Sequence, residues 1–307
     1  MILQYAHLTN HPAVFRSLTG LSVAQFDALC ADALPRYAEA ERLRHTRPDR
    51  RRAIGGGSQF TLAVRDHLLL SVVWLRVYPT YPLLGYLFGV SEFVAQRALK
   101  RVLPVLEAAG LDTMRLPDPG RGHRRALDDL LRETPDLAVL IDTYEQPVQR
   151  HKERTQADRW YSGKKRAHTV KTQVAVDEGD QRIVDVAPSE PGPMADVSVL
   201  RRSGFLSRVP RGVGVLGDLA YVGMTEGYPA VPGAWPRRKP RGKPRPAGDV
   251  AYNTAFARRR VPVEHAIGRM RRYQAVTQRD RHHRWGITSR NRAVAGLVNR
   301  ANWRLVD

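Results

Sequence analysis

Apolar residues recur at helical spacing through the first third of the chain. Residues 19–35 carry apolar side chains on one face, and Thr19 or Ser22 can cap this segment, so we predict a helix through Pro35. Residues 61–75 are apolar at nine positions, which predicts a helix buried on nearly all sides. These patterns indicate an N-terminal all-α region.

The next segment has the pattern of a helix-turn-helix. Leu83–Phe88 is predicted as a short helix, Gly89–Ser91 as a tight turn, and Glu92–Ala109 as a second helix capped by Ser91. Four side chains of the second helix would face a DNA groove: Gln96, Arg97, Lys100 and Arg101. The alternative is an ordinary helical hairpin whose basic face is solvated.

Beyond residue 134 the hydrophobic period changes to that of strands. Continuous or alternating apolar runs predict strands at 137–141, 168–177, 181–187 and 212–216, with a hairpin turn at 178–180 and a short continuation at Val148–Gln149 after a turn. Helices are predicted at 195–202, 253–273 and 289–305. This order predicts an α/β fold with a mixed sheet flanked by helices.

The chain is therefore expected to contain three parts. Residues 1–57 form a helical and basic region that ends in Gly55–Gly57, interpreted as a loop because no Gly-Lys-Ser/Thr follows. Residues 58–133 hold the helix-turn-helix and a linker rich in Pro, Gly and charge, with one short helix at 126–133. Residues 134–307 form the α/β domain, with a basic Pro- and Gly-rich insertion near 227–248.

Charge points to an anionic partner. The 307 residues hold 50 Lys and Arg against 30 Asp and Glu, for a net charge of +20, and 42% are hydrophobic, which excludes full disorder. Residues 237–300 contribute 18 basic and three acidic residues, a concentration typical of phosphate binding. The single Cys30 excludes a disulfide scaffold, and no apolar run is long enough for a membrane span. We expect a soluble cytoplasmic protein associated with nucleic acid.

Three carboxylates are candidates for binding catalytic metal ions. Asp142 and Asp218 each follow a buried strand, and Glu264 lies in an Arg-rich helix. Carboxylates at one sheet edge supply the hard oxygen ligands of Mg²⁺ or Mn²⁺, and two such ions can drive phosphodiester chemistry. Taken singly, each has a structural alternative: a turn-capping role for the aspartates and a surface ion pair for Glu264.

Five motifs, which together include these three carboxylates, occur in order along the chain and favour a shared catalytic role. They are IDTYEQPVQR, RWYSGKKRAHTVKTQVAVD, PGPMADVSVL, LGDLAYVGM and RRRVPVEHAIGRMRRY, and they span most of residues 58–285. Together they resemble the DDE transposases of bacterial insertion sequences, specifically the insertion-sequence-five-like group. The resemblance implies an N-terminal helix-turn-helix and a ribonuclease H-like catalytic core.

The resemblance also implies roles for individual residues. Asp142, Asp218 and Glu264 would be the catalytic carboxylates and would hold two divalent ions, Mg²⁺ or Mn²⁺. Water would first cut the end of the element, and the freed 3′-hydroxyl would then attack target DNA. The partners would be the terminal inverted repeats and the target DNA, bound by a homodimer or a larger assembly near the nucleoid.

Several basic residues are candidates for DNA contact. Arg260 and Arg271 share the helical face of Glu264, and Lys164, Lys165 and Arg166 form a basic turn near the first aspartate. The chain departs from common relatives at Leu219-Ala220 and Ala195, which stand in place of Lys-Gly and His. Two other functions stay open: a catalytically silent DNA-binding protein, and a protein that binds nucleic acid by charge alone.

Overall fold

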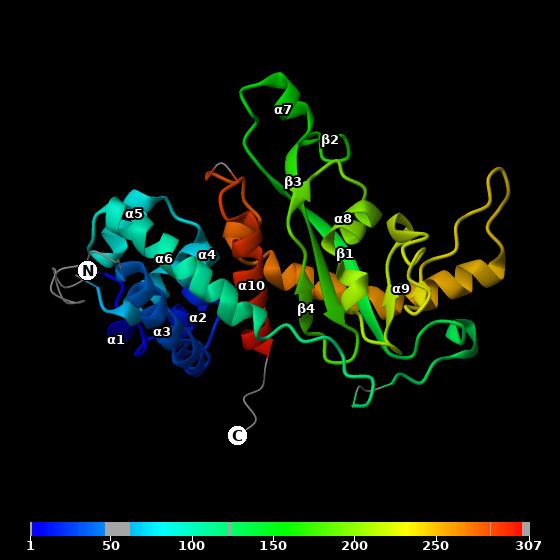
Figure 1. The fold of residues 1–307 in the computed structure, drawn as a ribbon, viewed down its shortest axis with the longest axis horizontal. Coiled ribbons are helices and arrows are strands. Elements are labelled where there is room, and N and C mark those ends of the chain that lie inside the picture. Colours follow the sequence, from blue (N-terminus) through cyan, green and yellow to red (C-terminus); the bar gives the residue numbers. More distant parts are fainter. Residues whose placement is uncertain (1, 47–61, 122–123, 283, 303–307) are drawn as a thin grey trace. The chain divides into compact units, whose positions relative to one another are not determined.

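The computed structural model describes residues 2–46, 62–121, 124–282 and 284–302 (Figure 1). The basic residues at 47–52 of the N-terminal region and the loop predicted at Gly55–Gly57 lie outside these residues. The chain divides into two compact units: the first contains residues 1–113, 272–276 and 292–307, and the second contains residues 114–271 and 277–291.

The first unit is all-helical, as predicted. Its first helices are α1 (Tyr5–Leu8), α2 (Pro12–Thr19), α3 (Val23–His45), α4 (Val64–Val77), α5 (Tyr81–Phe88) and α6 (Glu92–Leu111). The 3₁₀ turn η4 (Gln274–Val276) also belongs to this unit. Ser22 caps α3: its hydroxyl accepts from the N–H of Gln25, and the Gln25 side chain accepts from the N–H of Ser22. The prediction of a helix only through Pro35 is wrong. Proline disfavours a helix interior, but α3 packs against α4 and α6 and continues through Pro35 to His45.

The interior of the first unit is built around α4. Its residues from His67 to Leu75 are all buried, and Trp74 is among the largest fully buried side chains of the described chain. Helix α6 and the last helix, α10 (Ile287–Asn302), approach each other closely at two glycines. A Cβ placed on Gly296 would lie 2.3 Å from the Cα of Gly110, so this contact requires glycine on both sides.

The helix-turn-helix consists of α5, a turn and α6. Gly89 ends α5 in the left-handed conformation (φ 66°), and the Ser91 hydroxyl accepts a hydrogen bond of 3.3 Å from the N–H of Val94 at the start of α6. The predicted turn and cap are thereby confirmed.

The second unit contains a mixed sheet, as predicted. The strand order is β2-β3-β1-β6-β7, and β4 and β5 also pair with β3. β1 is antiparallel to β3 and parallel to β6, and β6 is parallel to β7. The strands are β1 (Ala138–Pro147), β2 (Tyr161–Ser162), β3 (Ala167–Asp177), β4 (Ile183–Val186), β5 (Glu190–Pro191), β6 (Gly214–Leu216) and β7 (Gly233–Ala234).

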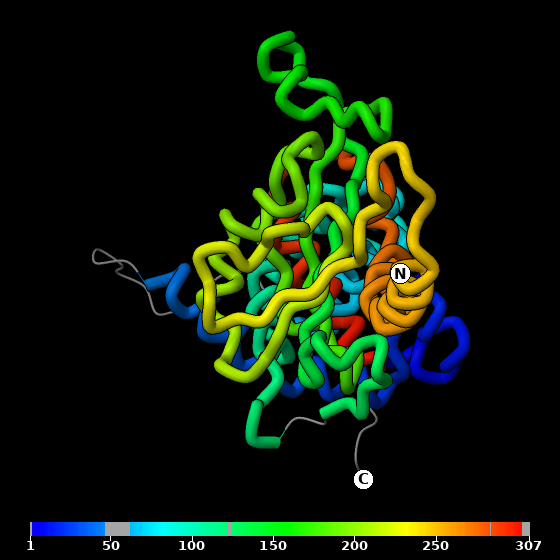
Figure 2. Tube along the Cα trace, turned by 90° about the vertical axis from the view of Figure 1, so that its right-hand side faces the viewer, coloured from blue at the N-terminus to red at the C-terminus, as the bar shows by residue number. Residues whose placement is uncertain are grey.

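Two local predictions in this unit are wrong. β1 does not end in a turn before Val148, because nine of its residues pair with β3 and keep it extended to Pro147. The expected helix at 126–133 is reduced to one 3₁₀ turn, η1 (Asp129–Leu131), where Thr134 folds back to hydrogen-bond the carbonyl of Leu131. Residues 148–160, which include α7 (Arg154–Asp158), extend beyond the end of the sheet in both views before the chain returns through β2 to pair with β3 (Figures 1 and 2).

Helices cover the two faces of the sheet. α8 (Asp196–Ser203) and the 3₁₀ turn η2 (Phe205–Arg208) lie on the face where Val139, Ile141 and Val215 form a core. The long helix α9 (Ala247–Met270) packs against β1 and β3 and begins six residues before its predicted start.

A buried ion pair anchors α9 to the sheet. Arg259 and Glu178 are 1% and 5% exposed, and Arg259 Nε donates to Glu178 Oε1 at 2.8 Å. Other nitrogens of the same guanidinium bond Thr134 Oγ1 and the carbonyl of Pro135. These bonds set the rotation of α9 about its axis and so decide which of its side chains face β1.

Candidate active site

Asp142 lies within β1, and Asp218 lies two residues beyond the end of the neighbouring parallel strand β6. Leu140 of β1 pairs with Leu216 of β6, and each aspartate stands two residues further along its own chain. Side chains alternate along a strand, so Asp142 lies on the face opposite the core residues Val139 and Ile141. Adjacent strands are about 4.8 Å apart, which places both carboxylates at one edge of the sheet.

The surroundings of Asp142 raise its pKa and so disfavour its charged form. Burial raises the pKa of this carboxyl, and the negative charges of Asp218 and Asp196 raise it further. The Arg260 guanidinium and the N–H of Thr143 offset only part of this increase. Asp142 Oδ2 accepts from Arg260 Nη2 at 3.1 Å, and Oδ1 accepts from Thr143 N at 2.7 Å.

Asp218 begins a 3₁₀ turn, η3 (Leu219–Tyr221). Its Oδ1 accepts from the N–H of Ala220 at 2.8 Å, as a capping aspartate does. Tyr221 of this turn is buried, and its hydroxyl donates to Gln173 Oε1 at 3.4 Å. Burial raises the pKa of Tyr221 well above the usual value, and the negative charges of Asp196, Asp142 and Asp218 add to this effect.

Helix α9 contributes a basic and an acidic side chain to this edge. Arg260, only 11% exposed, turns toward Asp142, and its Nε is buried without a hydrogen bond among the described residues. Glu264 is exposed one helical turn later. Glu264, Arg271 and Asp142 line the same cavity, which has a volume of about 320 Å³.

A Lys–Asp pair that sequence reasoning did not select completes the cavity wall. Lys171 of β3 and Asp196 at the start of α8 lie 2.6 Å apart, and Lys171 Nζ also donates to the carbonyl of Met194. Both residues line the cavity with Asp142. The available signal was the position of Asp196 at the first turn of a predicted helix within one of the five motifs.

The basic turn between β2 and β3 contains three of the residues predicted to contact DNA. Lys164, Lys165 and Arg166 are all exposed, and the two lysines line the cavity. Arg166 has a left-handed backbone (φ 49°) and is not among the lining residues.

The predicted recognition residues of α6 have different environments. Arg97 and Lys100 are exposed, and Gln96 is half-buried. Arg101 is paired with Glu41 of α3 at 3.6 Å and is 18% exposed, so it links two helices of the first unit.

The donor set at this edge fits a divalent cation in its chemistry. Asp142, Asp218 and Glu264 offer hard oxygen ligands. Burial and, to a lesser degree, the negative charges of Asp218 and Asp196 raise the pKa of Asp142, and a bound cation would favour its charged form. In the described part of the chain, no three His, Cys, Asp or Glu side chains are gathered closely enough to hold one ion.

Residues 141–299 match the family described as DDE superfamily endonuclease, which covers just over half of the chain. The chain belongs to the DDE superfamily of endonucleases. Residues 60–111 match the helix-turn-helix of this superfamily, in agreement with α5 and α6. The expected ribonuclease H-like core with an N-terminal helix-turn-helix is confirmed by these matches and by the mixed sheet.

The chain is also similar to a curated transposase. This chain is 26% identical over 246 residues to the probable transposase for insertion sequence element IS702 of Microchaete diplosiphon. The aligned region covers 79% of this chain and 82% of the relative. DDE superfamily endonucleases use divalent metal ions. Within the described ranges, no helix has the length and hydrophobicity needed to cross a membrane.

Proposed function

We propose that this DDE superfamily endonuclease is a DNA transposase that binds terminal inverted repeats and catalyses metal-dependent strand cleavage and strand transfer. The observation that supports the proposal is the parallel register of β1 and β6, from which Asp142 and Asp218 each stand two residues beyond a paired leucine. Arg260 of α9 donates to Asp142 Oδ2, and Glu264 of α9 lines the same cavity as Asp142.

Asp142, Asp218 and Glu264 are the residues that would hold two Mg²⁺ or Mn²⁺ ions. Such ions, when bound, make a water or 3′-hydroxyl a better nucleophile and stabilise the leaving oxygen. The protein itself supplies charge and orientation. Arg260 holds the Asp142 carboxylate in place through Oδ2.

Three other cations are positioned to contact DNA at this cavity. Lys164, Lys165 and Arg271 line it, and phosphate oxygens accept charge-assisted hydrogen bonds from such groups. Arg166 would contact the backbone beside the cavity. Arg97, Lys100 and Gln96 of α6 would contact the inverted repeat, and Arg101 would support α6 through Glu41.

Function divides along the chain in this proposal. Residues 58–133 recognise DNA, residues 134–307 carry the chemistry, and residues 1–57 complete the helical region. Since two element ends must be joined in one reaction, a homodimer or a larger assembly on DNA is expected, in the cytoplasm near the nucleoid. Light scattering with and without end DNA tests the assembly.

The decisive experiment measures cleavage of a linear DNA that carries the element's own end, with Mg²⁺ or Mn²⁺. Asp142→Asn, Asp218→Asn and Glu264→Gln should each abolish nicking and leave end binding intact. Asp129→Asn, at an exposed acid in η1, serves as the matched control and should cut like the wild type. A wild type that binds the end and never cuts establishes the silent DNA-binding alternative instead.

A further inference from the structure

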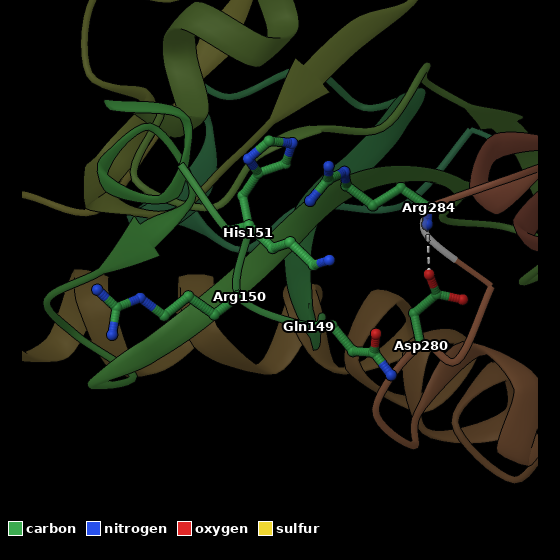
Figure 3. A pocket seen from close by; sticks show the side chains of 6 residues that line it. Gln149, Arg150, His151, Asp280 and Arg284 are labelled. Carbon is green, nitrogen blue, oxygen red and sulfur yellow. Dashed lines mark hydrogen bonds between the residues drawn. The ribbon is translucent and has the colours of Figure 1, made fainter. Parts of the chain in front are cut away.

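A second cavity lies where the segment after β1 meets the segment before α10. Its volume is about 280 Å³, and its lining residues are Gln149, Arg150, His151, Lys152, Asp280 and Arg284 (Figure 3). Two hydrogen bonds join the segments: Asp280 N donates to the carbonyl of Pro147 at 2.9 Å, and Gln146 Nε2 donates to the carbonyl of Gln278 at 2.8 Å. The cavity is thus built on the end of a regular strand.

The lining carries an excess of positive charge. Arg150, Lys152 and Arg284 form no salt bridge among the described residues, and the single lining carboxylate is already neutralised. Asp280 lies 2.7 Å from Arg290, and both side chains are 1% exposed. Burial raises the pKa of Asp280, but Arg290 and the N–H groups of Arg284 and His282 outweigh it and hold this carboxyl in its charged form.

Arg284 is held in position before any ligand arrives. Its backbone is left-handed (φ 64°), a costly conformation for arginine, and its N–H donates to Asp280 Oδ2 at 2.6 Å. Its guanidinium lies 4.7 Å from the centre of the Trp160 ring, a cation–π contact that fixes the side chain. The planar face of the guanidinium is occupied by this contact, while its N–H edges remain for an acceptor.

Two of these donors face each other across the cavity. In Figure 3, His151 and Arg284 extend toward each other across the pocket, and Arg150 extends away from it. A water occupies about 30 Å³ in the liquid, so the cavity has room for a phosphate group and several waters. A tetrahedral oxyanion is the ligand whose acceptors match an arginine edge, a lysine and an imidazole.

We propose that this pocket binds a backbone phosphate of DNA at a distance from the site of cleavage. The proposal rests on the function proposed above. Gln149 follows Asp142 by seven residues of mainly extended chain, which is roughly 23 Å at the rise of a β-strand. Phosphates of one strand are about 3.4 Å apart along the duplex axis, so the contact falls roughly seven base pairs from the scissile phosphate.

The test measures binding of the full-length protein to end-DNA duplexes of two lengths. The long duplex extends about twelve base pairs beyond the cleavage site on both sides, and the short duplex stops about three base pairs from it on both sides. Lys152→Gln and Arg284→Gly should weaken binding of the long duplex several-fold. The slope of log K against log salt should fall by about 0.9 for each lost phosphate contact. Binding of the short duplex should not change.

Arg284→Gly separates a binding defect from a folding defect. Glycine adopts the left-handed conformation without cost, so the substitution removes the guanidinium and relieves the backbone, and the thermal midpoint should be retained. Arg211→Gln, at an exposed arginine outside the cavity, is the matched charge control and should bind both duplexes like the wild type. Unchanged binding of the long duplex by Lys152→Gln and Arg284→Gly overturns the proposal.

Two further arms distinguish the sources of a phosphate. Inorganic phosphate is titrated into the wild type and into Arg284→Gly, and its binding is followed by calorimetry. If phosphate binds only the wild type while the two proteins bind the long duplex equally well, the pocket is a site for a free anion. That outcome also overturns the proposal. Cleavage is measured in parallel: if the wild type never cuts, the proposed function fails, while the difference in duplex binding still reports on the pocket.

Discussion

Replacing Arg259 with methionine should destabilise the second unit and loosen its active edge. Arg259 makes bonds to both carboxylate oxygens of Glu178, to Thr134 Oγ1 at 2.6 Å and to the carbonyl of Pro135 at 2.8 Å. The substitution leaves the Glu178 carboxylate buried with only Arg125, which is half exposed, at 3.0 Å. Removing one partner of a buried pair costs about 3–5 kcal/mol, and the remaining arginine favours the lower end.

The assay is hydrogen exchange of the backbone amides of β1 and β3, which reports the opening free energy of this unit separately from the helical unit. We expect Arg259→Met to lower that free energy by about 3 kcal/mol. In Arg259→Met/Glu178→Met, the unpaired charge is removed as well, so most of the loss should be recovered. Arg132→Met, at an exposed arginine, is the control and should change little.

The same substitution should affect function selectively. Arg259 sets the rotation of α9 and thereby places its neighbour Arg260 against Asp142. Strand cleavage should fall while binding of end DNA through α6 persists. A loss of less than 1 kcal/mol in Arg259→Met, or a double variant as unstable as the sum of both single variants, would refute the view that the pair anchors α9.

Further predictions concern packing, pH and DNA affinity. Gly296→Ala should destabilise the helical unit by about 2 kcal/mol, because the new Cβ would meet Gly110. Gly248→Ala is the control and should not destabilise the protein, because open space surrounds Gly248. Urea unfolding measures the free energy of unfolding of both variants. Asp280→Asn should lower the free energy of unfolding at neutral pH. The lost contribution is fully present above the unfolded-state pKa of about 3.9, and it disappears as pH falls through the lower folded-state pKa. The difference between wild type and variant should therefore shrink in urea titrations below about pH 4, and a difference that stays constant to pH 3 contradicts this. Lys100→Ala should weaken DNA binding and lower the salt slope by about 0.9, and an unchanged slope would place Lys100 off the DNA.

Local patterns in the sequence were sufficient for several parts of the molecule. The helix-turn-helix was predictable because Gly89 and Ser91 act on their immediate neighbours, through a left-handed turn and a capping hydroxyl. The buried strands ahead of Asp142 and Asp218 were predictable from short apolar runs, and the parallel pairing of β1 with β6 then sets the two aspartates at matching positions along the chain.

Contacts between distant residues decided the rest. Pairing with β3 keeps β1 extended past Asp142, and packing against other helices carries α3 through Pro35; neither effect is visible in a local window. The partners of Asp142 and Lys171, which are Arg260 and Asp196, come from other elements. The second cavity joins residues 149–152 to Asp280 and Arg284 across more than a hundred positions. The sequence by itself determined which side chains follow each strand and cap each helix, because those interactions are local. Only tertiary packing decided which charges face one another, because burial and pairing depend on how distant elements meet.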